Sequence, residues 1–441
     1  MLIEFSVENF LSFKNLTTFS MVAAKSFKEH NDTHIIKAES NLNVLKSSVI
    51  YGNNASGKSN FLQAMGFMKA MVLNSFRDAL IKNDKKNFPI EKFVLNSKSE
   101  KETSSFEISF IQNGIKYRYG FELDFDKVIS EWLFHTTSKE VYLFKRDQQH
   151  FEINKSAFKE ALGKEDDVKE NVLFLSFLAY YQKSQISNDI IQWFRNFIYI
   201  NGINDLEHKH YTIDKLKTNE RFLNWAIHFI RYLEIANLTI AEEDSVDFET
   251  FKQKIKGNEF LSLLASLQKV PLKLPKRDQL ITYHRKYDEN NVLVDTIPFY
   301  FDKQESEGTR KLLYLLGPWY DALQNGKVLV VDELDSRLHS HLTLRLINFF
   351  HYYNSNAQLI FAVHDCSLLN KETFRRDQIW FIEKNQFGAS ELFSLSDFKT
   401  DKVRNKSAFQ KNYFEGKYGA IPYFDFDEKL FDLMYGKRET I

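Results

Sequence analysis

Cysteine is almost absent from this 441-residue sequence, which contains one, Cys366. An internal disulfide framework and a zinc site with several cysteine ligands are therefore excluded. Proline and glycine are also scarce, at 6 and 15 residues, so we expect few long flexible linkers. No charge sign dominates, because 59 basic residues balance 59 acidic ones. A general cationic coat for nucleic acid is excluded, which leaves only local basic patches.

Long apolar runs and an N-terminal export signal are missing as well. The best apolar stretch, residues 172–181, is shorter than the roughly 20 residues that a membrane helix needs. The N-terminus lacks a basic segment followed by an apolar one. Aromatic residues are abundant, with 42 Phe and 20 Tyr, enough for a large core. We therefore expect a globular, cytoplasmic protein with no membrane partner.

The order of predicted elements changes along the chain. Apolar and polar residues alternate over residues 3–8, which is typical of a half-buried strand. Short β-rich runs follow one another from about 104 to 152, and Asn113-Gly114 between two of them indicates a hairpin, so we predict an antiparallel meander. Residues 155–275 have mostly helical patterns, whereas helices and strands alternate from 276 to 441.

The strongest chemical motif is a complete phosphate loop between an apolar strand and an amphipathic helix. It comprises Gly52, Asn53, Asn54, Ala55, Ser56, Gly57, Lys58 and Ser59, with Asn60 directly after it. The glycines allow a tight path that turns successive N–H groups towards a polyphosphate, and the helix directs its positive end to the same place. Lys58 is expected to bridge the outer phosphates, and the Ser59 hydroxyl to ligate Mg²⁺.

A second motif places two acids after a buried strand. Residues 328–331 are all apolar, and Asp332 and Glu333 follow them. On its own this pattern is more often structural than catalytic. Together with a phosphate loop, it predicts that Asp332 holds Mg²⁺ and that Glu333 polarises the attacking water. Nucleotide hydrolysis is the function that the pair indicates.

Two further pieces flank the acids. Upstream, Ser306 stands where a helix is expected to begin, and with Gly308 it offers a hydroxyl and N–H groups to an anion. Taken alone, this segment is more typical of an ordinary helix cap. Downstream, Asp335 follows the acids, and His364 comes just after an apolar strand. A neighbouring phosphate-loop strand would place His364 near the γ-phosphate.

Together these pieces resemble the ABC-type ATPase head, in the branch shared by chromosome-maintenance, RecF-type and OLD-type proteins. The opening residues 3–13 resemble the first strand and the asparagine-phenylalanine turn of that branch. More narrowly, residues 332–339 and the tail 413–422 are similar to stand-alone AAA-type (RloA/AbiL-like) ATPases of abortive-infection and anti-phage loci. The resemblance covers nearly the whole chain, but its specific motifs lie towards the two ends.

The resemblance implies an α/β fold: a mixed sheet flanked by helices, with an antiparallel meander and an inserted helical subdomain. The predicted division is an N-terminal ATPase lobe over 1–154, a helical insertion over 155–275 and a C-terminal ATPase lobe over 276–441. The implied cofactors are ATP and Mg²⁺.

The resemblance also implies roles for residues. Lys58, Ser59 and Asp332 would act in cis, Glu333 would be the general base, and His364 would sense the γ-phosphate. Ser306 and Gly308 would act in trans, on ATP held by a partner head, and Asp335 would couple the two sites. The implied assembly is a homodimer or higher homo-oligomer that sandwiches ATP. The signature differs from the family pattern, since Glu-Ser-Glu-Gly-Thr replaces Leu-Ser-Gly-Gly-Gln, and the glutamine-bearing loop has no clear counterpart.

Spacing limits what else the chain is expected to contain. The segment between Lys58 and Asp332 has no sustained heptad pattern, so a long coiled-coil arm is not expected. The segment after His364 is too short for an appended nuclease domain of ordinary size. We therefore expect that effector chemistry, such as nuclease activity, comes from a separate partner protein.

Three functions stay open at this point. The leading hypothesis is an ATPase that oligomerises with ATP and controls a separate effector in anti-phage defence, with DNA or a phage protein as the trigger. The alternative is a RecF-like repair ATPase that binds DNA by itself. A GTP-driven switch is disfavoured, because no Asn/Thr-Lys-x-Asp guanine-binding motif occurs.

Overall fold

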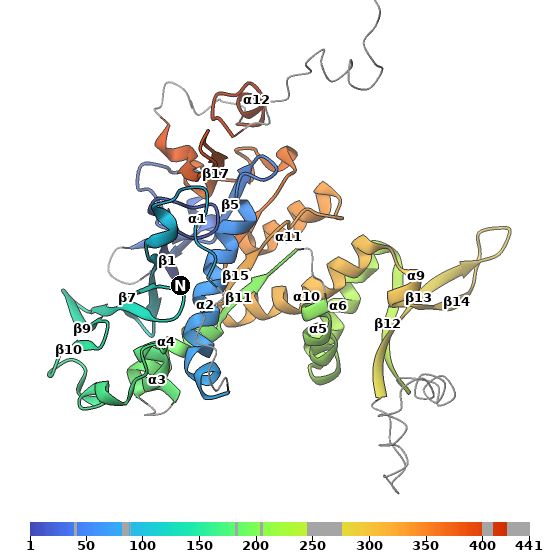
Figure 1. Ribbon diagram of the computed structural model, residues 1–441. Coiled ribbons are helices and arrows are strands. Elements are labelled where there is room, and N and C mark those ends of the chain that lie inside the picture. Colours follow the sequence, from blue (N-terminus) through green and yellow to red (C-terminus); the bar gives the residue numbers. More distant parts are fainter. Residues whose placement is uncertain are drawn as a thin grey trace, which may run out of the picture. The chain divides into compact units, whose positions relative to one another are not determined.

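The computed structural model describes residues 1–38, 42–81, 88, 90–180, 184–202, 206–244, 276–398 and 409–420. The chain forms two compact units, coloured along the sequence in Figure 1. Unit 1 comprises Met1–Ile203 and Ala322–Ile441, and unit 2 comprises Asn204–Asp321. Within the described ranges, no helix combines the length and apolar character that a membrane span requires.

Unit 1 contains a six-stranded, mostly parallel sheet. Its strand order is β11 (Phe197–Ile200), β15 (Val328–Val331), β16 (Gln358–Ala362), β5 (Ser47–Gly52), β17 (Ile379–Lys384) and β18 (Ser390–Ser394). Only β18 is antiparallel to its neighbour. The strands β15 and β16 are buried throughout, which explains their continuous apolar sequences. The carboxyl ends of β5, β15 and β16 therefore lie at one edge, where ligands of such sheets bind.

A seven-stranded antiparallel sheet forms the other half of unit 1. Its order is β10 (His150–Ile153), β9 (Glu140–Asp147), β8 (Val128–Thr136), β7 (Ile115–Leu123), β6 (Ser104–Gln112), β1 (Leu2–Glu8) and β2 (Thr17–Ser20). The predicted meander is confirmed, and Asn113 and Gly114 have the positive φ angles, 51° and 77°, of its hairpin turn. Gln112 ends β6 beside this turn. A short ladder of β3 (Ile35–Lys37) and β4 (Asn43–Leu45) completes the strands of this unit.

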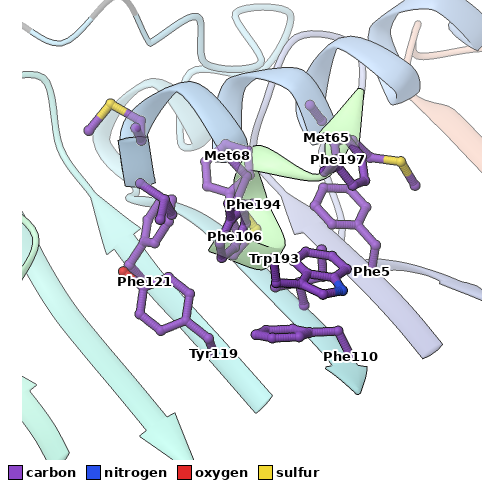
Figure 2. Close-up of a cluster of buried hydrophobic side chains, with 14 of the residues drawn as sticks. Phe5, Met65, Met68, Phe106, Phe110, Tyr119, Phe121, Trp193, Phe194 and Phe197 are labelled. Atoms are coloured by element: carbon purple, nitrogen blue, oxygen red, sulfur yellow. The ribbon is translucent and has the colours of Figure 1, made fainter. Parts of the chain in front are cut away.

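The main core lies between helix α2 (Lys58–Ile81) and the strands around it. Met65 and Met68 on α2 belong to the same apolar cluster as Trp193 of α4 (Gln185–Arg195), which stacks on Phe110 with ring centroids 4.1 Å apart. Figure 2 shows the labelled members of the cluster gathered beneath α2: Phe5, Met65, Met68, Phe106, Phe110, Tyr119, Phe121, Trp193, Phe194 and Phe197. The helix that begins at the phosphate loop is thus held along its length by buried aromatic side chains.

Unit 2 combines helices with a small antiparallel sheet. Its elements are α5 (Leu206–Thr218), α6 (Glu220–Ile230), β12 (Ile235–Asp244), β13 (Lys276–Tyr287), β14 (Leu293–Tyr300), α9 (Phe301–Gln304) and α10 (Glu307–Asn325). The sheet order is β12-β13-β14. The helical character predicted for 155–275 is confirmed in α3 (Phe174–Tyr180), α4, α5 and α6, but β11 and β12 were missed. Residues 245–275 lie outside the described residues.

Three histidines stack in unit 1, at the side of the parallel sheet. The rings of His34 and His351 are 3.6 Å apart, and His30 lies 4.5 Å from His34. His34 Nε2 donates to the Thr373 carbonyl at 2.9 Å, so its ring is held in place. Both His34 and His351 are about 1% exposed. Burial lowers the pKa of His34 to about 4, and it lowers the pKa of His351 well below the ordinary value.

We expect the protein to lose stability as pH falls from 7 to 5, because unfolded histidine takes up a proton near pH 6.5 whereas folded His34 does so only near pH 4. His34 alone accounts for about 2 kcal/mol of unfolding free energy over this interval. Urea unfolding at both pH values measures the loss. His34→Asn is expected to reduce the dependence, and His150→Gln, at an exposed site, to leave it unchanged. Equal pH dependence in wild type and His34→Asn would contradict this assignment.

Candidate functional site

The phosphate loop connects β5 to α2, and two of its positions have room only for glycine. A side chain at Gly52 would place its Cβ 2.3 Å from the Ile382 carbonyl oxygen. Gly57 has a φ of 113°, and a Cβ there would lie 2.3 Å from Ser390 Oγ. Both positions therefore require glycine, as the sequence motif predicts. Lys58 is buried, and its Nζ donates to the carbonyl oxygens of Gly52 and Asn53 at 2.6 and 3.0 Å.

Two serines from distant parts of the chain support this loop. Ser390 on β18 donates its hydroxyl hydrogen to the Ser56 carbonyl at 2.5 Å, and its Oγ lies within hydrogen-bond distance of Ser12 Oγ, at 2.7 Å. Ser12 belongs to the opening segment and also accepts from Asn60 Nδ2 at 2.9 Å. The opening motif thus contacts the phosphate loop directly. Sequence reasoning missed Ser390, because no local pattern marks it.

The two acids follow β15 at the same edge of the sheet. Asp332 is 3% exposed, and its backbone N–H donates to the Ile200 carbonyl on the neighbouring strand. Burial raises the pKa of Asp332, and a hydrogen bond from Ser59 partly offsets this effect. Glu333 has a left-handed φ of 49°, a costly conformation for a non-glycine residue and one typical of functional turns. Asp332 and Ser59, predicted as the metal pair, therefore lie in contact.

Asp335 connects the acidic turn to the strand end of His364. Its Oδ2 accepts from the backbone N–H groups of His364 and Asp365, at 2.8 and 2.6 Å. The N–H of Leu334 also donates to the Ala362 carbonyl, which ties the two loops together. The position of His364 therefore depends on Asp335 within the same chain.

These pieces surround one cavity of about 860 Å³. The residues that line it are Asn53, Asn54, Ala55, Ser56, Gly57, Lys58, Ser59, Asn60, Glu333, His364 and Lys384. Lys384 ends β17 and was missed by sequence reasoning, because an isolated lysine after a strand has no motif. Burial lowers the pKa of Lys58, and the carboxylates of Asp332, Asp335 and Glu333 offset this effect. The cavity therefore combines backbone N–H groups, cations and carboxylates, the composition that a metal-bound polyphosphate requires.

Buried polar atoms around the loop fit such a ligand. Four of them lack a hydrogen-bond partner: Asn53 Oδ1, Ser56 Oγ, Asp332 Oδ1 and Asp335 Oδ1. Unpaired buried polar atoms are costly, and at a site they indicate groups that a ligand satisfies. Mg²⁺ prefers one or two protein oxygens together with phosphates and water, which Ser59 and Asp332 match. Among the described residues, no cluster of three His, Cys, Asp or Glu forms a separate metal cage.

A second cavity of about 780 Å³ shares Asn60 and Lys384 with the first. Its lining is mainly apolar and includes Leu11, Ile90, Phe93, Val94, Leu95 and Phe125. Its size and character suit a flat, partly apolar group attached to the phosphates.

Ser306 and Gly308 lie at the start of α10 and are described within unit 2. Ser306 Oγ accepts from the Thr309 N–H at 3.1 Å, so the predicted helix cap is confirmed. Ser306 is exposed, and α10 is a 19-residue helix. The positive end of the dipole of such a helix lies at its N-terminus, beside Ser306. Helix starts of this kind attract anions.

The tail motif folds against β17. Tyr413, in α12 (Phe409–Phe414), stacks on Phe381 at 5.5 Å and lies 6.2 Å from Tyr51, the residue before the phosphate loop. Its hydroxyl donates to the Ala420 carbonyl at 2.7 Å. The packing role expected for this tail is therefore visible in residues 413–420, whereas 421 and 422 lie outside the described residues.

Truncating Tyr413 to alanine is expected to lower the unfolding free energy by about 3 kcal/mol, because a large buried ring is lost. Chemical denaturation measures the change. Phe414→Ala is the matched control, since Phe414 is 61% exposed, and we expect it to cost less than about 1 kcal/mol. Equal losses in the two variants would show that the tail does not pack as described.

The phosphate loop after β5, the parallel sheet and the acids after β15 define a phosphate-loop nucleotide-binding domain. The sequence matches the family described as "AAA domain, putative AbiEii toxin, Type IV TA system" over residues 47–370, and the chain belongs to that family. It is therefore a member of an ATPase class. Curated protein sequences give no match to the chain.

Solved structures similar to the chain include two SMC heads and the recombination mediator RecF. The SMC head domain from Thermotoga maritima has 12% identity and a TM-score of 0.36, and covers 89% of this chain and 98% of that one. The SMC head bound to the C-terminal winged-helix domain of ScpA has 11% identity and a TM-score of 0.40, with 91% and 99% covered. The recombination mediator RecF with a nucleotide analogue has 14% identity and a TM-score of 0.33, with 89% and 98% covered.

Proposed function

We propose that this chain binds ATP with Mg²⁺, hydrolyses it, assembles with a second copy around the nucleotide, and controls a separate effector protein in anti-phage defence. The observation that supports the chemistry is the single cavity that the phosphate loop, Glu333 and His364 line together. The unpaired buried Asp332 Oδ1 beside the loop is an acceptor that a Mg²⁺ ion and its water ligands would satisfy.

Nucleotide binding would use the loop and its two neighbouring cavities. The N–H groups of residues 53–59 and the Lys58 ammonium would hold the β- and γ-phosphates, and Lys384 would add a second cation at the junction of the cavities. Ser59 and Asp332 would hold Mg²⁺, which neutralises phosphate charge when bound. The apolar second cavity would take the base. Lys58 would exchange its two carbonyl partners for phosphate oxygens.

Hydrolysis would depend on Glu333. The oxygen of a water attacks the γ-phosphorus, the bond to the β–γ bridging oxygen breaks, and the water proton passes to the Glu333 carboxylate. His364 would contact the γ-phosphate. The Asp335 carboxylate holds the backbone of His364 in place, because it accepts a hydrogen bond from the His364 N–H. ADP and inorganic phosphate are the products.

The second copy would complete the site with its signature segment. Ser306 and the N-terminus of α10 form an exposed helix start in unit 2, whereas the phosphate loop belongs to unit 1. In the proposed dimer, Ser306 and Gly308 of each copy bind the γ-phosphate held by the other. ATP would thus join the two copies, and its hydrolysis would separate them.

The last part of the proposal is effector control. The family description names a putative toxin of a type IV TA system, which supports a role beside a second protein. The test is a pull-down of Glu333→Gln from its native host with ATP and Mg²⁺, with and without nuclease. A second protein that survives nuclease treatment would support the proposal. Recovery of DNA alone, lost as salt rises, would contradict it and favour the RecF-like repair function.

A further inference from the structure

Glu305 directly precedes the exposed signature serine, yet its own side chain is only 8% exposed. Its Oε1 accepts two short hydrogen bonds, from Thr282 Oγ1 at 2.5 Å and from His284 Nε2 at 2.6 Å. Both donors lie on β13, the central strand of the small sheet. The residue before Ser306 is therefore fixed to this sheet by its side chain.

The two donors are themselves rigidly placed. Thr282 is fully buried, and the ring of His284 packs on Phe299 of β14 with centroids 4.4 Å apart. Since β13 pairs with both β12 and β14, neither donor can shift without moving the sheet. A carboxylate held by two groups of this kind has little freedom of orientation.

On the other side of Glu305, the signature helix is held by Asp302. The Asp302 carbonyl accepts from Arg310 Nη1 at 2.8 Å, and its carboxylate binds Lys209 at 2.5 Å and the hydroxyl of Tyr314. These contacts fix the body of α10 but do not involve Ser306, whose hydroxyl bonds to Thr309 of its own helix start within the described part of the chain. The backbone directly before Ser306 is therefore held through the side chain of Glu305, which is bonded to Thr282 and His284.

We propose that Glu305 is a positioning residue, which sets the orientation of Ser306 and of the α10 N-terminus by fixing them to the β13–β14 hairpin. The inference rests on the proposed function, in which Ser306 binds the γ-phosphate held by a second copy. If Glu305 has this role, a displacement of the β13–β14 hairpin would change the orientation of Ser306 and of the α10 N-terminus. Glu305 belongs to unit 2 and is not among the residues that line the phosphate-loop cavity, so its removal affects assembly and turnover but not binding of ATP at the phosphate loop.

The experiment measures three quantities for Glu305→Ala: ATP-dependent dimerisation in the Glu333→Gln background, turnover in the otherwise wild-type protein, and ATP affinity at protein concentrations below dimerisation. We expect about a tenfold weaker dimer and about a tenfold lower turnover number, with ATP affinity changed by less than about twofold. Glu305→Gln keeps an acceptor oxygen and is expected to restore dimerisation to within about threefold. Glu289→Ala removes an exposed carboxylate from the same hairpin and is the matched control.

Two results would overturn the proposal: a Glu305→Ala dimer as strong as wild type, or a Glu305→Gln dimer as weak as that of Glu305→Ala. If Glu305→Ala fails to fold, Thr282→Val removes one of the two bonds with little change in shape, and an unweakened dimer would then overturn it. A further variant, Ser306→Arg, distinguishes failure of the proposed ATP-dependent dimer from failure of the positioning role of Glu305. If Ser306→Arg still dimerises with ATP, the proposed function fails. If it does not dimerise but Glu305→Ala does, only the positioning role fails.

Discussion

Replacing Glu333 by glutamine is expected to lower the ATP turnover number about 100-fold or more, with ATP affinity within about threefold of wild type. Glutamine has the shape of glutamate and would line the same cavity, but its amide cannot accept the proton of the attacking water. Binding depends on the loop N–H groups and Lys58, which the substitution leaves in place. Phosphate release and calorimetric titration measure the two quantities.

The control for this variant is Glu372→Gln, whose side chain is 73% exposed. We expect it to hydrolyse ATP at the wild-type rate. Turnover by Glu333→Gln within about threefold of wild type would remove Glu333 from the role of general base. Loss of ATP affinity together with turnover would instead assign it to binding.

Replacing Lys58 by methionine is expected to weaken ATP binding about 100-fold or more and to abolish measurable turnover. Methionine keeps the apolar stem, but it cannot neutralise the phosphates that enter beside Asp332, Glu333 and Asp335. The fold is expected to persist, because burial of the ammonium is itself unfavourable, as the lowered pKa of Lys58 shows. Titration with a fluorescent ATP analogue measures the affinity.

Lys371→Met is the matched control for Lys58, because its side chain is about half exposed and its ammonium pairs with exposed Glu372 at 3.8 Å, not with residues of the phosphate-loop cavity. Unchanged nucleotide affinity is expected there. If Lys58→Met bound ATP as tightly as this control, the phosphate loop would not be the nucleotide site, and the cavity around it would need another ligand.

Local motifs made much of the site predictable. The phosphate loop is contiguous, and each of its glycines has a local steric reason that the structure repeats at Gly52 and Gly57. The acids after β15 were predictable because a wholly apolar run, residues 328–331, is typical of a buried parallel strand. The position of His364 followed from the strand before it. The structure adds that Asp335 of the same chain holds this histidine.

Long-range contacts explain what the sequence did not reveal. Ser390 supports the phosphate loop through Ser12, which lies 378 positions earlier in the chain. The strand β11 has only four residues, and a short apolar run after a helix is ambiguous between helix and strand. Glu305 precedes the signature in sequence, but its partners lie on β13, and no spacing rule connects them.

The central claim is that one active site is built from two copies of the chain, and mixing two inactive variants tests it most directly. Lys58→Met supplies an intact signature and Ser306→Arg an intact phosphate loop, and each alone is expected to be inactive. In an equal mixture, only the mixed dimers contain a complete site, one of two in each, so turnover should recover to a measurable fraction of the wild-type value, at most about half. If both variants are folded and their mixture is as inactive as each variant alone, the active site is not shared between two copies.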